Sequence, residues 1–161
     1  MEKMEKKPIQ VYAETSVFGG VCDDEFSRSS RAFFDLIRLG KFHLIISALV
    51  EDELLPAPVQ VRSFFEEMIE FYEITRITSE AFELQQAYLK AGIVTPKRMN
   101  DALHVAVATV SGCKIIVSWN FKHIVHFEKI RFYNAVNALN GYDSISIYSP
   151  LEVIGDENQD F

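Results

Sequence analysis

Two periods of hydrophobic residues alternate along the chain. Short apolar runs rich in β-branched and aromatic residues predict strands, whereas apolar residues that recur every three or four positions predict helices. The predicted strands cover residues 9–13, 42–46, 73–77, 114–118 and 144–148. The predicted helices cover residues 27–39, 48–55, 58–72, 79–91, 96–110 and 130–139, with short turns at 15–19 and 150–154. Strands separated by helices throughout favour an α/β fold with a mostly parallel sheet.

The strongest pattern lies between residues 100 and 120. The helix there is apolar on nearly all sides, which predicts that it is buried. The strand that follows is a short apolar run, typical of a strand buried on both faces of a parallel sheet. Asp101 lies near the start of this otherwise apolar helix. Because burying a lone carboxylate is costly, we expect Asp101 to face a cation, a hydrogen-bond donor or water.

Capping residues set the predicted helix boundaries. Thr15 or Ser16 is predicted to cap the first short turn, and Ser79 the helix over 79–91. Gly40 and Gly92 are predicted to end the helices that precede them.

The length and composition favour one globular domain over residues 8–154, with mobile tails over 1–7 and 155–161. The charged N-terminus has no apolar stretch like that of a secretory signal, and no apolar run approaches membrane length, so a cytoplasmic protein is expected. Cys22 and Cys113 are flanked by apolar residues and are expected to be reduced thiols in or near the core.

The net charge of −7 counts against a partner held by phosphate contacts alone, since such contacts need a basic surface. A nucleic-acid substrate remains compatible with this charge, because bound metal ions supply positive charge that a residue count omits.

Acidic and amide side chains follow the predicted strands. Glu14 comes directly after the first strand, Glu53 lies on the helix after the second, and Asn120 ends the fourth. In an open parallel sheet the carboxyl ends of the strands form the ligand site, so these side chains and Asp101 are expected to converge. Converging acids repel unless a hard cation joins them, and oxygen ligands suit Mg²⁺ or Mn²⁺. Taken singly, each residue also fits a structural role as a cap, a turn residue or a solvated acid.

Four segments, taken in order, resemble the PIN-domain family of metal-dependent nucleases, which includes the toxins of many toxin–antitoxin pairs. The segments are residues 11–16, 46–54, 101–106 and 117–123. The resemblance implies a three-layer α/β/α fold with a central sheet of about five strands. It also implies metal-dependent hydrolysis of phosphodiester bonds, with RNA as the substrate.

The resemblance assigns Glu14, Glu53 and Asp101 as metal ligands, with Asn120 as a further ligand or as the residue that holds a water. Glu14 and Asn120 both stand where the family usually has aspartate. Asn120 removes one negative charge, which predicts weaker metal binding and leaves open an alternative function: a catalytically weak or inactive PIN-like binding or scaffold module.

Three further residues of these segments are candidates for substrate binding. Ser16 is expected to position a phosphate or a metal-bound water, whereas Lys122 and His123 are expected to contact the substrate backbone. Candidate protein partners are an antitoxin and a second copy of the chain.

His104 lies one helical turn after Asp101, on the same face, and is expected to be a hydrogen-bonded residue at the edge of the core rather than a catalytic group. His123 and His126 have a spacing that could chelate a metal, but without a nearby cysteine or third histidine a zinc site is not expected.

Overall fold

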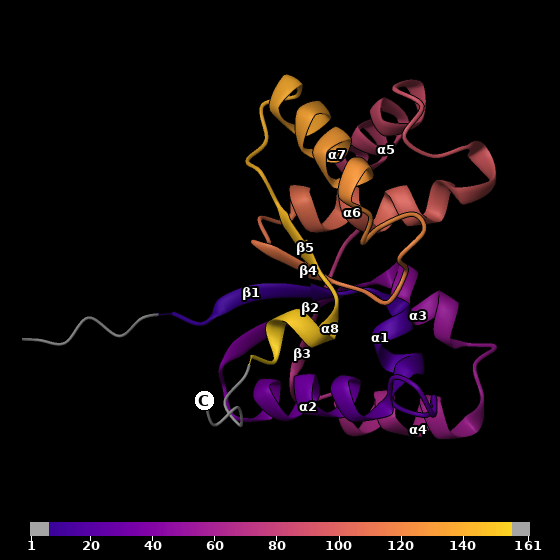
Figure 1. The fold of residues 1–161 in the computed structure, drawn as a ribbon, viewed down its shortest axis with the longest axis vertical. Coiled ribbons are helices and arrows are strands. Elements are labelled where there is room, and N and C mark those ends of the chain that lie inside the picture. The colour runs from indigo at the N-terminus through magenta and orange to yellow at the C-terminus, as the bar shows by residue number, and fades with distance from the viewer. Residues whose placement is uncertain (1–6, 156–161) are drawn as a thin grey trace, which may run out of the picture.

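A computed structural model describes residues 7–155 and contains one five-stranded sheet (Figure 1). Its strands are β1 (Ile9–Ala13), β2 (Phe42–Ser47), β3 (Tyr72–Thr75), β4 (Ile115–Val117) and β5 (Ser146–Tyr148). They lie in the order β3-β2-β1-β4-β5, and every neighbouring pair is parallel. The prediction of an α/β fold with a mostly parallel sheet of about five strands is confirmed.

Helices cover both faces of this sheet. In Figure 1, α5, α6 and α7 lie on one side of the sheet, and α2 and α4 lie on the other, so the fold has three layers, α/β/α. Helices α1 and α3 directly follow β1 and β2 and therefore lie at the carboxyl ends of the strands. The helices are α1 (Thr15–Gly20), α2 (Ser27–Arg38), α3 (Ala48–Leu54), α4 (Val59–Glu67), α5 (Ser79–Lys90), α6 (Met99–Val110), α7 (Phe127–Leu139) and α8 (Pro150–Val153), with a 3₁₀ turn, η1 (Pro96–Arg98), before α6.

Helix α6 is buried on all sides, as its composition predicts. Every residue from 102 to 109 is buried. The helix packs between α5 and the sheet, so it has no solvent face to carry polar residues. Its first turn, which holds Asp101, is the part that reaches the edge of the core.

Two predicted boundaries are wrong. The helix predicted over 58–72 ends at Glu67, because a turn that joins the Phe71 N–H to the Met68 carbonyl stops it and Tyr72 pairs with Leu44 in the sheet. The helix predicted over 130–139 starts at Phe127. Its first turn faces solvent, with Phe127 and Glu128 exposed, so the periodicity of buried positions starts only later.

Two predicted caps are also shifted by one position or more. Glu14, rather than Thr15 or Ser16, precedes α1 with extended backbone, and Thr78 rather than Ser79 caps α5. The helix stops predicted at Gly40 and Gly92 are confirmed: both have φ near +77°, a conformation that side chains with a Cβ rarely adopt.

The two cysteines differ in environment. Both are free thiols; Cys113 is buried, as predicted, but Cys22 is exposed because it lies in the loop that follows α1. The tails predicted over 1–7 and 155–161 fall almost entirely on residues 1–6 and 156–161, which lie outside the described residues. Between residues 7 and 155, no helix has both the length and the apolar character needed to cross a membrane.

Candidate functional site

The strand order reverses between β1 and β4. From β1 the chain builds the sheet toward β3 on one side, and β4 and β5 are added on the other. In open parallel sheets a crevice forms outside the carboxyl ends of the strands at such a point. Glu14 follows the last residue of β1, and its N–H donates to the Val117 carbonyl at the end of β4 (3.0 Å). Glu14 and the β4 loop therefore lie together at the position where this architecture places ligands.

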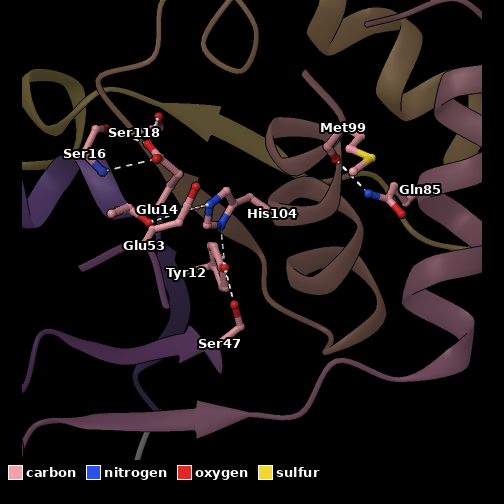
Figure 2. Close-up of polar contacts among 10 residues, drawn as sticks. Tyr12, Glu14, Ser16, Ser47, Glu53, Gln85, Met99, His104 and Ser118 are labelled. Atoms are coloured by element: carbon pink, nitrogen blue, oxygen red, sulfur yellow. Dashed lines mark hydrogen bonds and ion pairs between the residues drawn. The ribbon is translucent and has the colours of Figure 1, made fainter. Parts of the chain in front are cut away.

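Glu14 is buried, with 6% of its surface exposed, and its carboxylate is surrounded by donors. Its Oε1 accepts hydrogen bonds from the hydroxyls of Ser16 (2.5 Å) and Ser118 (2.6 Å), and its Oε2 accepts from the Ser16 backbone N–H (3.1 Å) (Figure 2). Hydrogen bonds of this kind stabilise the ionised form of a carboxylate. These three hydrogen bonds fix the orientation of the Glu14 carboxylate at the strand end.

The same two hydroxyls connect α1 to the β4 loop. The Ser16 hydroxyl oxygen accepts from the Trp119 N–H (2.9 Å), and the Ser118 hydroxyl oxygen accepts from the Asn120 N–H (2.9 Å). Ser16, expected to bind substrate, therefore contacts the Glu14 carboxylate and fixes the loop at the same time.

Glu53 approaches from α3 and is partly buried. Its Oε1 accepts hydrogen bonds from the Thr15 hydroxyl (2.6 Å) and from His104 Nε2 (2.5 Å). Burial alone would raise the pKa of Glu53, but the hydrogen bond and charge of His104, together with the bond from Thr15, outweigh it and hold the pKa below its ordinary value. Glu53 is therefore a carboxylate at neutral pH.

Glu14, Glu53 and His104 form a cluster suited to a metal ion. One ligand-type atom from each residue lies within 4.8 Å of the other two. The three residues come from positions 14, 53 and 104 and meet only because β1, α3 and α6 converge at the strand ends.

Asp101 lies beside this cluster rather than in it. Burial raises the pKa of Asp101 and the negative charge of Glu14 raises it further, whereas His123, His104 and Asn120 act in the opposite direction. The net effect is a raised pKa, caused first by burial and then by the charge of Glu14, and a bound cation would offset both effects. Carboxylates under such mutual repulsion fit a hard divalent cation.

The first turn of α6, which carries Asp101, is anchored from α5. The buried Gln85 side chain donates to the Met99 carbonyl (2.8 Å), as Figure 2 shows. This bond satisfies both groups and fixes the start of α6 relative to the sheet.

Asn120, Lys122 and His123 lie on the loop after β4. The Asn120 Oδ1 accepts from the His123 N–H (3.0 Å), so its amide holds the turn. Lys122 is exposed. Burial lowers the pKa of the partly exposed His123, Asp101 opposes this, and Lys129, Arg98 and Lys122 reinforce it. His123 on this loop therefore lies close enough to Asp101 for their charges to interact.

The sequence did not single out several residues that shape this site. They are polar side chains that contact a candidate ligand or its partner: Tyr12, Thr15, Ser47 and Ser118. Position next to a strand end was the available signal for Thr15 and Ser118. By contrast, nothing in the chain's pattern distinguishes Tyr12 from an ordinary core tyrosine. The expectation that His104 is a buried, hydrogen-bonded histidine is confirmed.

Comparisons with known proteins support the fold. No protein-family model and no curated protein sequence matches the chain. Two crystal structures share its architecture. VapBC2 from Rickettsia felis, bound to a DNA fragment from its promoter, aligns with a TM-score of 0.56 and 14% identity over 88% of this chain and 98% of its own. FitAcB from Neisseria gonorrhoeae aligns with a TM-score of 0.56 and 12% identity over 89% of this chain and 99% of its own.

Proposed function

From the PIN-like fold that this chain has, we propose that it is an endoribonuclease that uses Mg²⁺ or Mn²⁺ to hydrolyse phosphodiester bonds of RNA. The observation that carries the proposal is the convergence of Glu14 and Glu53 at the β1–β4 switch point, beside Asp101, whose pKa is raised by burial and then by the charge of Glu14.

Glu14 and Glu53 are the proposed metal ligands, and Asp101 and Asn120 complete the oxygen-rich side of the site. Both donors to Glu53 bind its Oε1, and among residues 7–155 no hydrogen bond to its Oε2 is found, so this oxygen is available to a cation. A divalent ion bound here would polarise a phosphoryl oxygen and lower the pKa of a coordinated water.

Asp101 is the proposed group that orients the attacking water and accepts its proton. A carboxylate with a raised pKa is a stronger base than an ordinary aspartate, which suits this role. Asp101 is not a member of the Glu14–Glu53–His104 cluster, so it would act on water while the glutamates hold the metal.

The substrate would lie across the mouth of this site. Lys122 and His123 would contact its phosphates, and the cationic Lys122 side chain would supply positive charge that the overall charge of −7 does not provide. A groove of about 310 Å³ is lined by Ser16 and Glu53 and by the apolar residues Leu54, Pro58 and Val61. Its mixed polar and apolar lining is suited to a nucleotide next to the scissile bond.

We also propose that the chain is the toxin of a toxin–antitoxin pair and that a separate antitoxin protein binds it. Its structural similarity to VapBC2 and FitAcB supports this assignment. A second copy of the chain is the other proposed partner. Gel filtration with light scattering of the chain alone distinguishes a monomer from a dimer.

Metal binding is the first test of the proposed function. A ligand that binds only the folded state stabilises it by about 2.7 kcal/mol at 100 times its Kd, so Mn²⁺ should raise Tm by about 5–10 °C. The measurement is a thermal melt with increasing MnCl₂, followed by cleavage of a pool of structured and single-stranded RNAs. If millimolar Mn²⁺ leaves Tm unchanged, the chain is the inactive binding or scaffold module instead.

Restoring the fourth acid should strengthen metal binding. Asn120→Asp adds a negative charge near Asp101 and keeps an oxygen that can accept from the His123 N–H, so the turn is retained. We expect Mn²⁺ affinity to rise about tenfold, the size of effect that neighbours of a metal site commonly have. Isothermal titration calorimetry measures it, with the distant Asn140→Asp as the charge-matched control. Equal affinities for both variants would place Asn120 outside the metal site.

A further inference from the structure

We propose that His104, held by Tyr12, is a positioning residue that aims the Glu53 carboxylate at the metal and is not itself a metal ligand. This inference rests on the proposed function. Its basis is a continuous row of hydrogen bonds: Ser47 Oγ to Tyr12 Oη (2.8 Å), Tyr12 Oη to His104 Nδ1 (2.8 Å), and His104 Nε2 to Glu53 Oε1 (2.5 Å) (Figure 2).

The row runs through the interior of the protein. Ser47, Tyr12 and His104 are each 0% exposed, and they come from the end of β2, from β1 and from α6. A buried polar side chain without a partner is costly, so such groups are retained only where each is satisfied. Here every member has a partner, and the row ends on the one residue that reaches the site, Glu53.

Both ring nitrogens of His104 are already engaged. Nδ1 bonds Tyr12 and Nε2 bonds Glu53, so neither lone pair is directed at a cation. A metal ligand needs a free nitrogen lone pair, with the other nitrogen donating to a second group. His104 therefore lies in the cluster with Glu14 and Glu53 as the partner of a ligand.

The chemistry of the end groups sets the direction of the hydrogen bonds. The Glu53 carboxylate can only accept, so Nε2 carries the proton. With the proton on Nε2, Nδ1 accepts a hydrogen bond from the Tyr12 hydroxyl. The Ser47 hydroxyl can in turn donate to Tyr12 Oη, which leaves the Tyr12 proton for His104. Tyr12 thus selects the tautomer that donates to Glu53.

The result is an oriented carboxylate. His104 and Thr15 donate to the same oxygen, Oε1, from two different elements, and so fix the plane of the group. Oε2 accepts no hydrogen bond from residues 7–155 and is free to bind a cation. Without His104, one donor would remain and the carboxylate could rotate, which would cost metal affinity rather than fold stability alone.

The test compares variants of matched size. His104→Met removes both nitrogens, and Tyr12→Phe removes only the hydroxyl. Tyr88→Phe is the control, because Tyr88 is equally buried and its hydroxyl donates to Asn137, between α5 and α7 and outside the site. By calorimetry, Mn²⁺ binding should weaken about 10–100-fold in His104→Met and about tenfold in Tyr12→Phe. Tyr88→Phe should leave Mn²⁺ affinity unchanged, even if it lowers Tm as much as Tyr12→Phe does.

A double variant separates positioning from general destabilisation. If Tyr12 acts only through His104, then adding Tyr12→Phe to His104→Met should not weaken Mn²⁺ binding further. Additive losses overturn the proposal, and so does unchanged Mn²⁺ affinity in both single variants when the wild type binds; in either case the proposed nuclease stands. Absence of Mn²⁺ binding by the wild type overturns both. If His104→Met does not fold, the comparison of Tyr12→Phe with Tyr88→Phe decides the outcome.

Discussion

Asp101→Asn is expected to abolish RNA cleavage and at the same time to stabilise the metal-free protein. Asparagine keeps the size of the side chain but cannot accept a proton from water, so cleavage should fall by a factor of about 10²–10⁴. It also removes the charge whose ionisation burial and Glu14 disfavour. The measurements are single-turnover cleavage with Mn²⁺ and thermal melts in the presence of a chelator.

The pH dependence of this stabilisation has a definite sign. The raised pKa means that folded Asp101 binds a proton more tightly than unfolded Asp101 does, so its contribution to stability is present at low pH and is lost as pH rises through the folded pKa. The Tm advantage of Asp101→Asn over the wild type should therefore be largest at neutral pH and shrink toward pH 4.

The exposed Asp143 provides the charge-matched control, because it precedes β5 and so lies toward the amino ends of the strands, away from the site at their carboxyl ends. Asp143→Asn should leave cleavage intact and give no pH-dependent gain in Tm. If Asp101→Asn instead lowers Tm at neutral pH, the carboxylate is a structural group with a satisfied partner, and its assignment as the base is wrong.

These opposite effects are typical of a site that trades stability for function. Glu14 is surrounded by donors and Glu53 is held by two, whereas the ionised form of Asp101 is disfavoured by burial and by the charge of Glu14. The disfavoured carboxylate, Asp101, is thus the residue that the proposed mechanism uses as the proton acceptor.

The sequence predicted the layers of the fold because burial leaves periodic traces. Helix α6 is apolar on all sides and β4 is a short apolar run, and both are buried as these patterns require. The patterns failed where the first turn of a helix has no buried residue, as at Phe127, or where one apolar stripe runs past a turn, as at Tyr72. Hydrophobic periodicity indicates which residues are buried, and it indicates where a helix or strand begins and ends only indirectly.

The sequence predicted that Glu14 and Glu53 come together, but it did not predict the hydrogen bonds that connect the residues of the site. The rule that ligands gather at strand ends pointed to Glu14 and Glu53, which the structure brings together with ligand atoms within 4.8 Å of each other. The bond between Tyr12 and His104 spans 92 positions and depends on how α6 is rotated against β1. That rotation is a property of three-dimensional packing, and no local pattern in the chain encodes it.

Gly20→Ala is expected to be among the most destabilising single-methyl changes in the protein, whereas Gly19→Ala, one position earlier, should be neutral or stabilising. A Cβ at Gly20 would lie 2.5 Å from Ser30 Oγ and 2.7 Å from Trp119 Nε1, two atoms that hydrogen-bond each other at 2.8 Å. At Gly19 no atom lies within 4 Å of the added methyl, and alanine favours the helix by about 0.5–1 kcal/mol.

The cost at Gly20 comes from overpacking. Forcing a methyl into a filled core costs about 1–3 kcal/mol, which for a chain of this length lowers Tm by about 2–10 °C. The displaced Trp119 also donates its backbone N–H to Ser16, whose hydroxyl holds Glu14, so Mn²⁺ binding should weaken in the folded variant as well. Gly19→Ala should leave Mn²⁺ binding at the wild-type level.

Trp119 is the one tryptophan in the sequence, so its fluorescence reports this region directly. It is 7% exposed and stacks on Phe26 with ring centroids 4.1 Å apart, an environment that the Gly20 methyl would disturb. We expect a shifted emission maximum in native Gly20→Ala and an unchanged one in Gly19→Ala. Identical emission and Tm for the two variants would mean that the contact between α1 and the β4 loop is looser than described, and that Trp119 does not couple the core to Glu14.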